Sequence, residues 1–129
     1  MSYRILIADD DAVFWIPCIG HVLEAAGFEI DIALTPTQCR DAIERASFDV
    51  VLLDICFDDE HEDGLGLLPE VRLRRPAAKV VMFSGLDDRQ TVASCASLGA
   101  HAFVSKNTVS PTELWGRISE LLSEGAARG

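Results

Sequence analysis

Residues 50–54 read VVLLD, four consecutive branched apolar side chains followed directly by a carboxylate. A strand with one face in solvent alternates apolar and polar residues. A continuous apolar run is instead typical of a parallel strand that helices cover on both faces. The run therefore predicts a central strand of an α/β sheet, with Asp54 at its carboxyl end.

The rest of the chain repeats this pattern, since short aliphatic runs alternate with longer helical stretches. The expected strands lie near residues 4–8, 28–33, 48–54, 79–84 and 101–105. Two helix starts carry a hydroxyl residue, a proline and then Gln or Glu, at residues 35–38 and 110–113. Gly27 and Gly99 mark helix ends. Right-handed crossovers then favour a doubly wound open sheet, which binds ligands beyond the carboxyl ends of its strands.

Two prolines and the C-terminal residues modify this pattern. Pro17 falls inside the expected first helix, so that helix should start late or kink, because an interior proline removes a hydrogen bond. Pro69 falls in the second turn of a third helix that begins near Asp63 or Gly64. The last residues, SEGAARG, are typical of a frayed end or the start of a linker. We expect a domain at residues 1–123 and a tail at 124–129.

Length and composition indicate one globular domain. The chain has 129 residues, of which 49% are hydrophobic and 25% charged. Its apolar runs are shorter than the ~18 residues of a membrane span, and its first residues lack a signal-peptide core, so we expect a cytoplasmic protein without membrane contact. A formal charge of −10 argues against direct nucleic-acid binding. Four cysteines without CxxC spacing are expected to be reduced.

Carboxylates from two separate segments are expected at one edge of the sheet. Asp9, Asp10 and Asp11 follow the first strand, and Asp54 follows the third. One such Asp alone could be a helix cap. Two carboxylates about 4 Å apart, however, repel by roughly 4 kcal/mol at an effective dielectric near 20. Protons or a divalent cation would relieve this repulsion, and oxygen ligands suit magnesium, which we favour.

A serine and a lysine are expected at the same edge. Ser84 ends the fourth strand and Lys106 ends the fifth, and the only other lysine is Lys79. A lysine beside an acidic cluster pairs with it and later holds an incoming anion, to which a serine hydroxyl also donates. Each residue alone is a weak signal, because most lysines and strand-end serines are merely exposed.

The order of acid pair, Asp, Ser and Lys at the ends of strands one, three, four and five resembles the receiver domain of two-component response regulators. The resemblance covers about residues 3–123. It implies a flavodoxin-like (CheY-like) sheet of five parallel strands in the order 2-1-3-4-5.

The resemblance also implies a role for each matching position. Asp54 would accept the phosphoryl group, and Asp9 and Asp10 would bind Mg²⁺ together with Asp54 and the backbone carbonyl of Cys56. Ser84 would hydrogen-bond the phosphoryl group and Lys106 would pair with it. Phe103 would be the aromatic residue that moves with Ser84, although a plain core aromatic is the simpler interpretation.

The function so implied is a phosphorylation-dependent switch and not a dedicated enzyme. A sensor histidine kinase or phosphotransfer protein would supply the phosphoryl group. A homodimer or an output partner would use the face of the fourth helix, fifth strand and fifth helix. The chain would be either a stand-alone regulator or the receiver part of a larger response regulator or transcription factor. The alternative is a pseudo-receiver, a protein-binding module that does not accept phosphate.

Two departures from the family pattern affect the site. The family commonly has proline after the lysine, whereas this chain has Asn107, so we expect a trans peptide bond and a differently shaped loop. The spacing from Asp54 to Gly64 is about two residues longer than usual. We therefore interpret the acidic run 58–63 as an enlarged loop beside the site, which could help choose among kinases.

Three further interpretations concern single residues. Asp59, His61, Asp63, Gly64 and Glu70 fall at positions 1, 3, 5, 6 and 12 of an EF-hand template. Histidine at position 3, Pro69 at position 11 and a preceding strand oppose calcium binding. A haloacid-dehalogenase-type phosphatase is rejected because Cys56 replaces its second aspartate. Trp15 is expected near the acid pair, and Trp115, beside the apolar stripe of the last helix, would mark a partner face if partly exposed.

Overall fold

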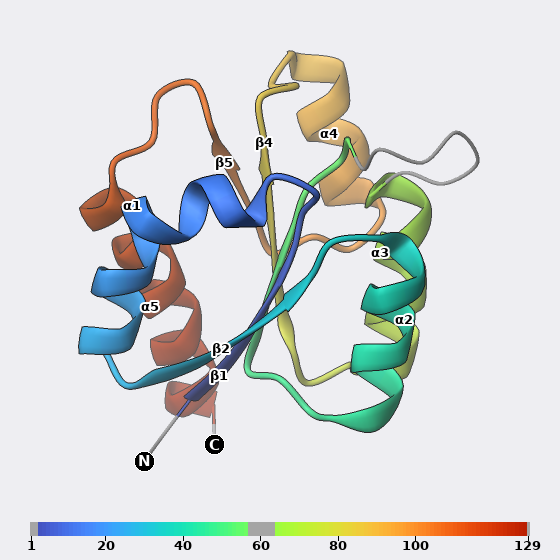
Figure 1. Ribbon diagram of the computed structural model, residues 1–129. Helices are drawn as coiled ribbons and strands as arrows, with labels where there is room; N and C mark the ends of the chain where they lie inside the picture. The colour runs from blue at the N-terminus through green and yellow to red at the C-terminus, as the bar shows by residue number, and fades with distance from the viewer. Residues whose placement is uncertain (1–2, 57–63, 129) are drawn as a thin grey trace.

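The computed structural model describes residues 3–56 and 64–128, and it contains one five-stranded parallel sheet in the order β2-β1-β3-β4-β5 (Figure 1). This confirms the expected fold. The strands are β1 (Tyr3–Ala8), β2 (Phe28–Ala33), β3 (Val50–Leu53), β4 (Lys79–Ser84) and β5 (Ala102–Ser105). The helices are α1 (Ala12–Ala25), α2 (Pro36–Arg45), α3 (Gly64–Arg74), α4 (Arg89–Ser97) and α5 (Pro111–Arg128).

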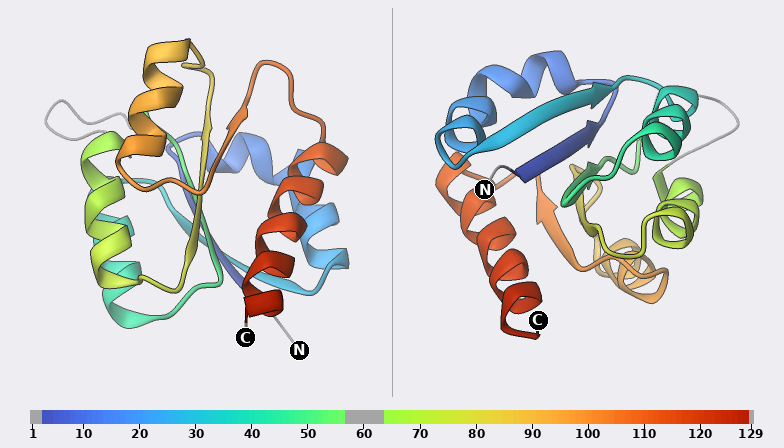
Figure 2. Two further views of the ribbon diagram at one scale, coloured as in Figure 1. Left: turned by 180° about the vertical axis from the view of Figure 1, so that it is seen from behind. Right: turned by 90° about the horizontal axis from the view of Figure 1, so that it is seen from below.

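Helices cover both faces of the sheet (Figure 2), α1 and α5 on one face and α2, α3 and α4 on the other. β3 shows how the sequence produces this arrangement. Val50 and Leu52 pack in the core under α1 and α5, whereas Val51 and Leu53 pack in the core under the other three helices. All four side chains are at most 1% exposed. Because successive side chains on a strand point to opposite faces, a strand buried on both faces needs apolar residues throughout.

The strand ends differ from the expected ones by up to two residues. β3 covers residues 50–53 instead of 48–54. Hydrogen bonds to β1 nevertheless continue past both ends, from Asp49 N to Arg4 O (2.8 Å) and from Asp54 N to Ala8 O (2.9 Å). Asp54 thus stays attached to the neighbouring strand although it stands just beyond β3.

The helix caps expected from the sequence are present. The Thr35 hydroxyl accepts a hydrogen bond from Gln38 N at the start of α2 (3.1 Å), and the Ser110 hydroxyl accepts one from Glu113 N at the start of α5 (3.2 Å). Gly27 and Gly99 have φ values of 93° and 105°, a conformation that other residues adopt only with strain. These local signals place the first residues of α2 and α5 and the last residues of α1 and α4.

Both prolines lie inside helices, as expected. α1 does not start late, and it bends near its middle (Figure 1), which is the kinked alternative for a helix that contains Pro17. Pro69 lies in the second turn of α3. α5 continues to Arg128, so residues 124–128, expected as a tail, extend the helix, and the domain boundary at residue 123 stays a prediction.

Three expectations concern the chain as a whole. Among the residues that the structure describes, no helix is long and apolar enough to cross a membrane. All four cysteines are free thiols. The acidic run 58–63 lies outside the described residues, and so does most of the calcium template, including Asp59, His61 and Asp63.

Gly64, the first residue of α3, lies against the backbone at the end of β3. Its N–H donates to Ile55 O (2.7 Å). A Cβ atom added to Gly64 would lie 2.7 Å from the Asp54 carbonyl carbon and 2.8 Å from Ile55 Cα. Backbone atoms cannot rotate away as a side chain does, so this approach requires glycine.

We expect Gly64→Ala to lower the free energy of unfolding by roughly 3 kcal/mol, the upper range for overpacking. The matched control is Gly116→Ala in α5, because a Cβ there meets nothing within 4 Å. That change should stabilise the protein by about 0.5–1 kcal/mol through helix propensity. Urea unfolding of both variants measures the effects, and equal stabilities would show that the close approach at Gly64 is unimportant.

Candidate functional site

The pairing of β1 with β3 brings two carboxylates together. Ala8 and Leu53 are register partners, and Asp9 and Asp54 are the next residue of each chain segment. Asp9 N donates to Ala33 O (2.9 Å), so the backbone of this aspartate is tied to β2 as well. Asp9 is 1% and Asp54 3% exposed. The fold therefore holds two acids side by side, away from water.

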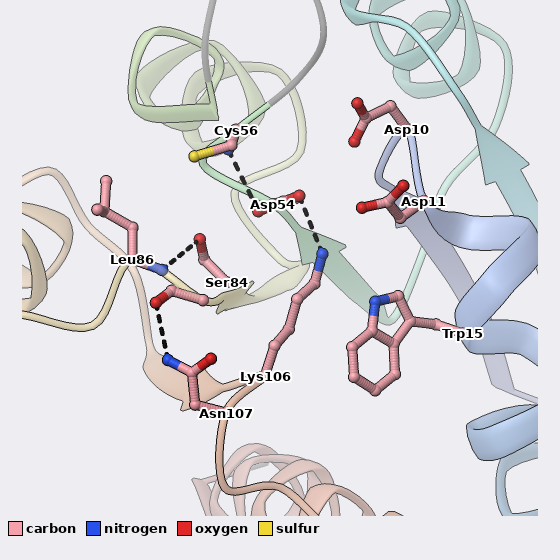
Figure 3. Close-up of a pocket in the computed structure, with 10 residues that line it drawn as sticks. Asp10, Asp11, Trp15, Asp54, Cys56, Ser84, Leu86, Lys106 and Asn107 are labelled. Atoms are coloured by element: carbon pink, nitrogen blue, oxygen red, sulfur yellow. Dashed lines mark hydrogen bonds and ion pairs between the residues drawn. The ribbon is translucent and has the colours of Figure 1, made fainter.

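Lys106 stands between these two carboxylates. Its Nζ lies 2.7 Å from Asp9 Oδ2 and 3.0 Å from Asp54 Oδ2, and its side chain is 11% exposed (Figure 3 draws the contact with Asp54). Its backbone N–H donates to Ser84 O (3.0 Å), which ties β5 to the end of β4. Burial opposes the charge on Lys106, but the hydrogen bonds and charges of the two carboxylates outweigh it and raise the lysine's pKa. Lys106 is thus a fixed ammonium ion.

Two aromatic rings complete the surroundings of this ammonium. Lys106 Nζ lies 5.7 Å from the centroid of the Trp15 ring and 5.4 Å from that of Phe83, distances that allow cation–π attraction. The two rings meet edge to face with centroids 5.0 Å apart. Trp15 therefore lies beside the acid pair, as the sequence predicted.

The acidic cluster carries more negative charge than Lys106 neutralises. Oxygens of Asp9, Asp10 and Asp54 lie within 4.8 Å of one another. Burial raises the pKa of Asp9 from 3.8 to about 6, and the charge of Asp54 adds to this, although hydrogen bonds from Lys106 and from the backbone N–H of Asp11 oppose it. A convergent set of carboxylate oxygens that is short of positive charge fits a hard divalent cation such as magnesium.

These groups open into a cavity of about 670 Å³. Asp10, Asp11 and Trp15 lie on one side of Asp54 and Lys106, and Ser84, Leu86 and Asn107 lie on the other (Figure 3). Asp54 Oδ1 accepts a hydrogen bond from Cys56 N (3.2 Å), and the buried Ser84 Oγ accepts one from Leu86 N (3.2 Å). This volume has room for a tetrahedral anion beside Asp54 and Lys106, which both line the cavity.

The structure brings together six of the seven residues predicted from the sequence, namely Asp9, Asp10, Asp54, Cys56, Ser84 and Lys106. Phe103 does not line the cavity. It is half-buried in β5 and packs against the core under α2, α3 and α4. The roles assigned to these residues, including the Cys56 carbonyl as a metal ligand, stay predictions.

Sequence reasoning missed the part that Asn107 and Asp87 play beside the site. Asn107 stood out only because proline was absent, and Asp87 gave no signal at all. As expected, no cis peptide bond occurs among the described residues, so the Lys106–Asn107 bond is trans. The loop after Lys106 is held by hydrogen bonds of Asn107 to Gly85 O (2.9 Å) and Asp87 Oδ2 (3.2 Å).

Comparison with known proteins identifies the family. The family model described as the response regulator receiver domain matches residues 5–119. The chain therefore belongs to the receiver domains of response regulators, which are signalling modules of two-component systems. A crystal structure of a CheY-like response regulator receiver domain protein from Methanospirillum hungatei JF-1 is similar over 100% of both chains, with 32% identity and a TM-score of 0.89.

Two curated relatives are longer than this chain. The putative response regulator NtrX-like protein of Rickettsia bellii is 28% identical over 102 residues, which are 79% of this chain and 21% of that protein. The photosynthetic apparatus regulatory protein RegA of Rhodobacter capsulatus is 26% identical over 123 residues, 95% of this chain and 63% of RegA. The chain thus spans about a fifth of one relative and less than two thirds of the other.

The raised pKa of Asp9 predicts how stability depends on pH without metal. Because the native carboxyl holds its proton to about pH 6 and the unfolded one only to about 3.8, the unfolded state binds fewer protons between these values. This group's contribution to the free energy of unfolding should therefore fall as pH rises from about 4 to 6 and stay constant above.

Asp9→Asn should remove this slope and raise the stability at pH 7 by on the order of 2 kcal/mol relative to the native protein. Urea unfolding in EDTA at several pH values between 4 and 7.5 measures the difference. The comparison isolates Asp9 from the other acids, which both proteins share. Parallel pH curves for the two proteins would contradict the assignment.

Proposed function

We propose that this chain accepts a phosphoryl group on Asp54 from a sensor histidine kinase or a phosphotransfer protein, in a magnesium-dependent reaction in the cytoplasm. The observation that supports this most is the position of Lys106 Nζ, within 3.0 Å of both Asp54 Oδ2 and Asp9 Oδ2. A carboxylate that reacts with a phosphoryl group needs positive charge beside it, because nucleophile and electrophile are both anionic.

In this proposal Asp9, Asp10 and Asp54 hold Mg²⁺, with the Cys56 carbonyl as a further ligand. Bound magnesium would supply charge neutralisation to the phosphoryl oxygens. The three carboxylates would hold the ion next to the reacting oxygen of Asp54. Their closeness supports this assignment, because three convergent carboxylates are costly without a cation.

Lys106 and Ser84 would hold the phosphoryl group during transfer. The P–N bond of the donor phosphohistidine breaks as a P–O bond forms to a carboxylate oxygen of Asp54. Among the described residues, Cys56 N donates to one Asp54 oxygen and Lys106 Nζ to the other, so a carboxylate oxygen that does not bind the ion would keep a lone pair for the attack. Lys106 Nζ would then leave the Asp54 carboxylate and bind the new phosphoryl oxygens, to which the Ser84 hydroxyl would also donate.

The product would change a surface away from the cavity. Ser84 would move toward the phosphoryl group, and Phe103, two positions before the register partner of Ser84, would follow it. The face of α4, β5 and α5 would then favour a homodimer or an output partner. Because the curated relatives are longer, we propose that residues 1–123 form the receiver unit of a stand-alone regulator or of a larger one.

Phosphoryl uptake is tested with acetyl phosphate and Mg²⁺ by mass spectrometry of the intact protein. The native chain should gain one phosphoryl group, and Asp54→Asn should gain none, because an amide is a poor nucleophile toward phosphorus. Lys106→Met should lower the rate by about a hundredfold, the usual scale for one electrostatic contact to the transition state. A native protein without mass gain would instead favour the pseudo-receiver, a binding module of the same fold.

Magnesium binding is tested by the fluorescence of Trp15, which lines the cavity. In Trp115→Phe, Trp15 is the remaining tryptophan. Titration with Mg²⁺ should change its emission in a saturable way at millimolar concentrations, because the ion alters the charge next to the ring. Adding Asp10→Asn should weaken the apparent affinity. A flat titration in Trp115→Phe would contradict the metal site beside Trp15.

A further inference from the structure

Asn107 joins the loops that follow β4 and β5. Its side-chain amide donates to Gly85 O (2.9 Å), the contact drawn beside Asn107 in Figure 3. The same nitrogen donates to Asp87 Oδ2 (3.2 Å). A carboxamide nitrogen carries two protons, so these contacts use both of them. Residues about 20 positions apart in the sequence are thereby tied together.

Ser105 completes a closed network with Asn107 and Asp87. The Ser105 hydroxyl donates to Asp87 Oδ2 (2.7 Å) and accepts a hydrogen bond from Asn107 N (3.1 Å). The hydrogen bonds from Ser105 and Asn107 lower the pKa of Asp87, so its carboxylate stays charged as their common acceptor. The Ser105 hydroxyl and the Asn107 side-chain amide thus converge on one carboxylate, and the Asn107 backbone N–H holds the hydroxyl between them.

The network flanks the two residues that would hold the phosphoryl group. Asn107 directly follows Lys106, and Gly85 directly follows Ser84. Lys106 N already donates to Ser84 O (3.0 Å), but that bond fixes only the backbone at the strand ends. The Asn107 amide adds a second connection one residue further along each loop. Without it, the Ser105–Asp87 hydrogen bond would be left to join the exposed residues beyond the two strand ends.

We propose that Asn107 is a positioning residue for phosphoryl transfer, which holds the loop of Lys106 against the loop of Ser84 so that the two side chains act as one unit. The inference rests on the proposed function and names a residue that affects the rate of phosphoryl transfer. Proline could not take this part, because it has neither the N–H nor the amide that make these bonds. Small displacements of a positioned group lower rates strongly even when binding persists.

The test measures phosphoryl uptake from acetyl phosphate in the native chain and in Asn107→Ala, as a function of Mg²⁺ concentration. The maximal rate should fall by about five- to tenfold, the effect of one or two lost positioning hydrogen bonds. The Mg²⁺ concentration for half-maximal rate should stay within about twofold, because Asp9, Asp10 and Asp54 are untouched. If Asn107 only stabilised the fold, its loss would not lower the maximal rate while leaving the Mg²⁺ concentration for half-maximal rate unchanged.

The matched control is Thr108→Ala, an exposed change in the same loop. It should leave both quantities as in the native chain. A maximal rate for Asn107→Ala within twofold of that of Thr108→Ala would overturn the inference alone, and so would an equal loss of Mg²⁺ affinity. No uptake by the native chain would overturn the proposed function and this inference with it.

A double-mutant cycle tests the network itself. Asp87→Ala removes the shared acceptor, so it should also lower the maximal rate. Because Asn107 and Asp87 act through the same connection, the double variant should lose less than the product of the two single effects. Independent, multiplicative effects would show that the two residues do not act together, and would overturn the network as the cause.

Discussion

The ammonium group of Lys106 between two buried carboxylates is the interaction on which the site depends. The register of β1 with β3 forces Asp9 and Asp54 together, so the same pairing that builds the sheet also creates strong repulsion. One lysine offsets part of it. The remaining negative charge beside the cavity would be neutralised by a divalent cation. The electrostatics of the site therefore follow from strand pairing.

Local signals predicted much of the fold, because their causes are local. The run at residues 50–53 identified a strand buried on both faces, and the Thr35 and Ser110 caps and the two glycines fixed helix ends. The strand order came from the family resemblance alone, since right-handed crossovers allow several orders. Strand ends moved by up to two residues because backbone hydrogen bonds such as that of Asp54 extend past the regular ladder.

The site was predictable where parallel strands bring their ends to one edge, as for Asp9, Asp54, Ser84 and Lys106. Side-chain contacts between loops were not. The bonds of Asn107 to Gly85 and Asp87 depend on how two loops meet, and the sequence records only that proline is absent. The same holds for Gly64. That this position has no room for a Cβ atom becomes visible only when α3 is packed against the end of β3.

The bond between Gly64 N and Ile55 O holds the start of α3 against the end of β3. The two anchoring residues keep their separation whatever number of residues the chain inserts between them. The entropy of loop closure grows only slowly with length, by about 0.6 kcal/mol per doubling. A change in the number of residues between Ile55 and Gly64 therefore need not move Asp54, whose backbone N–H stays bonded to Ala8 O on β1.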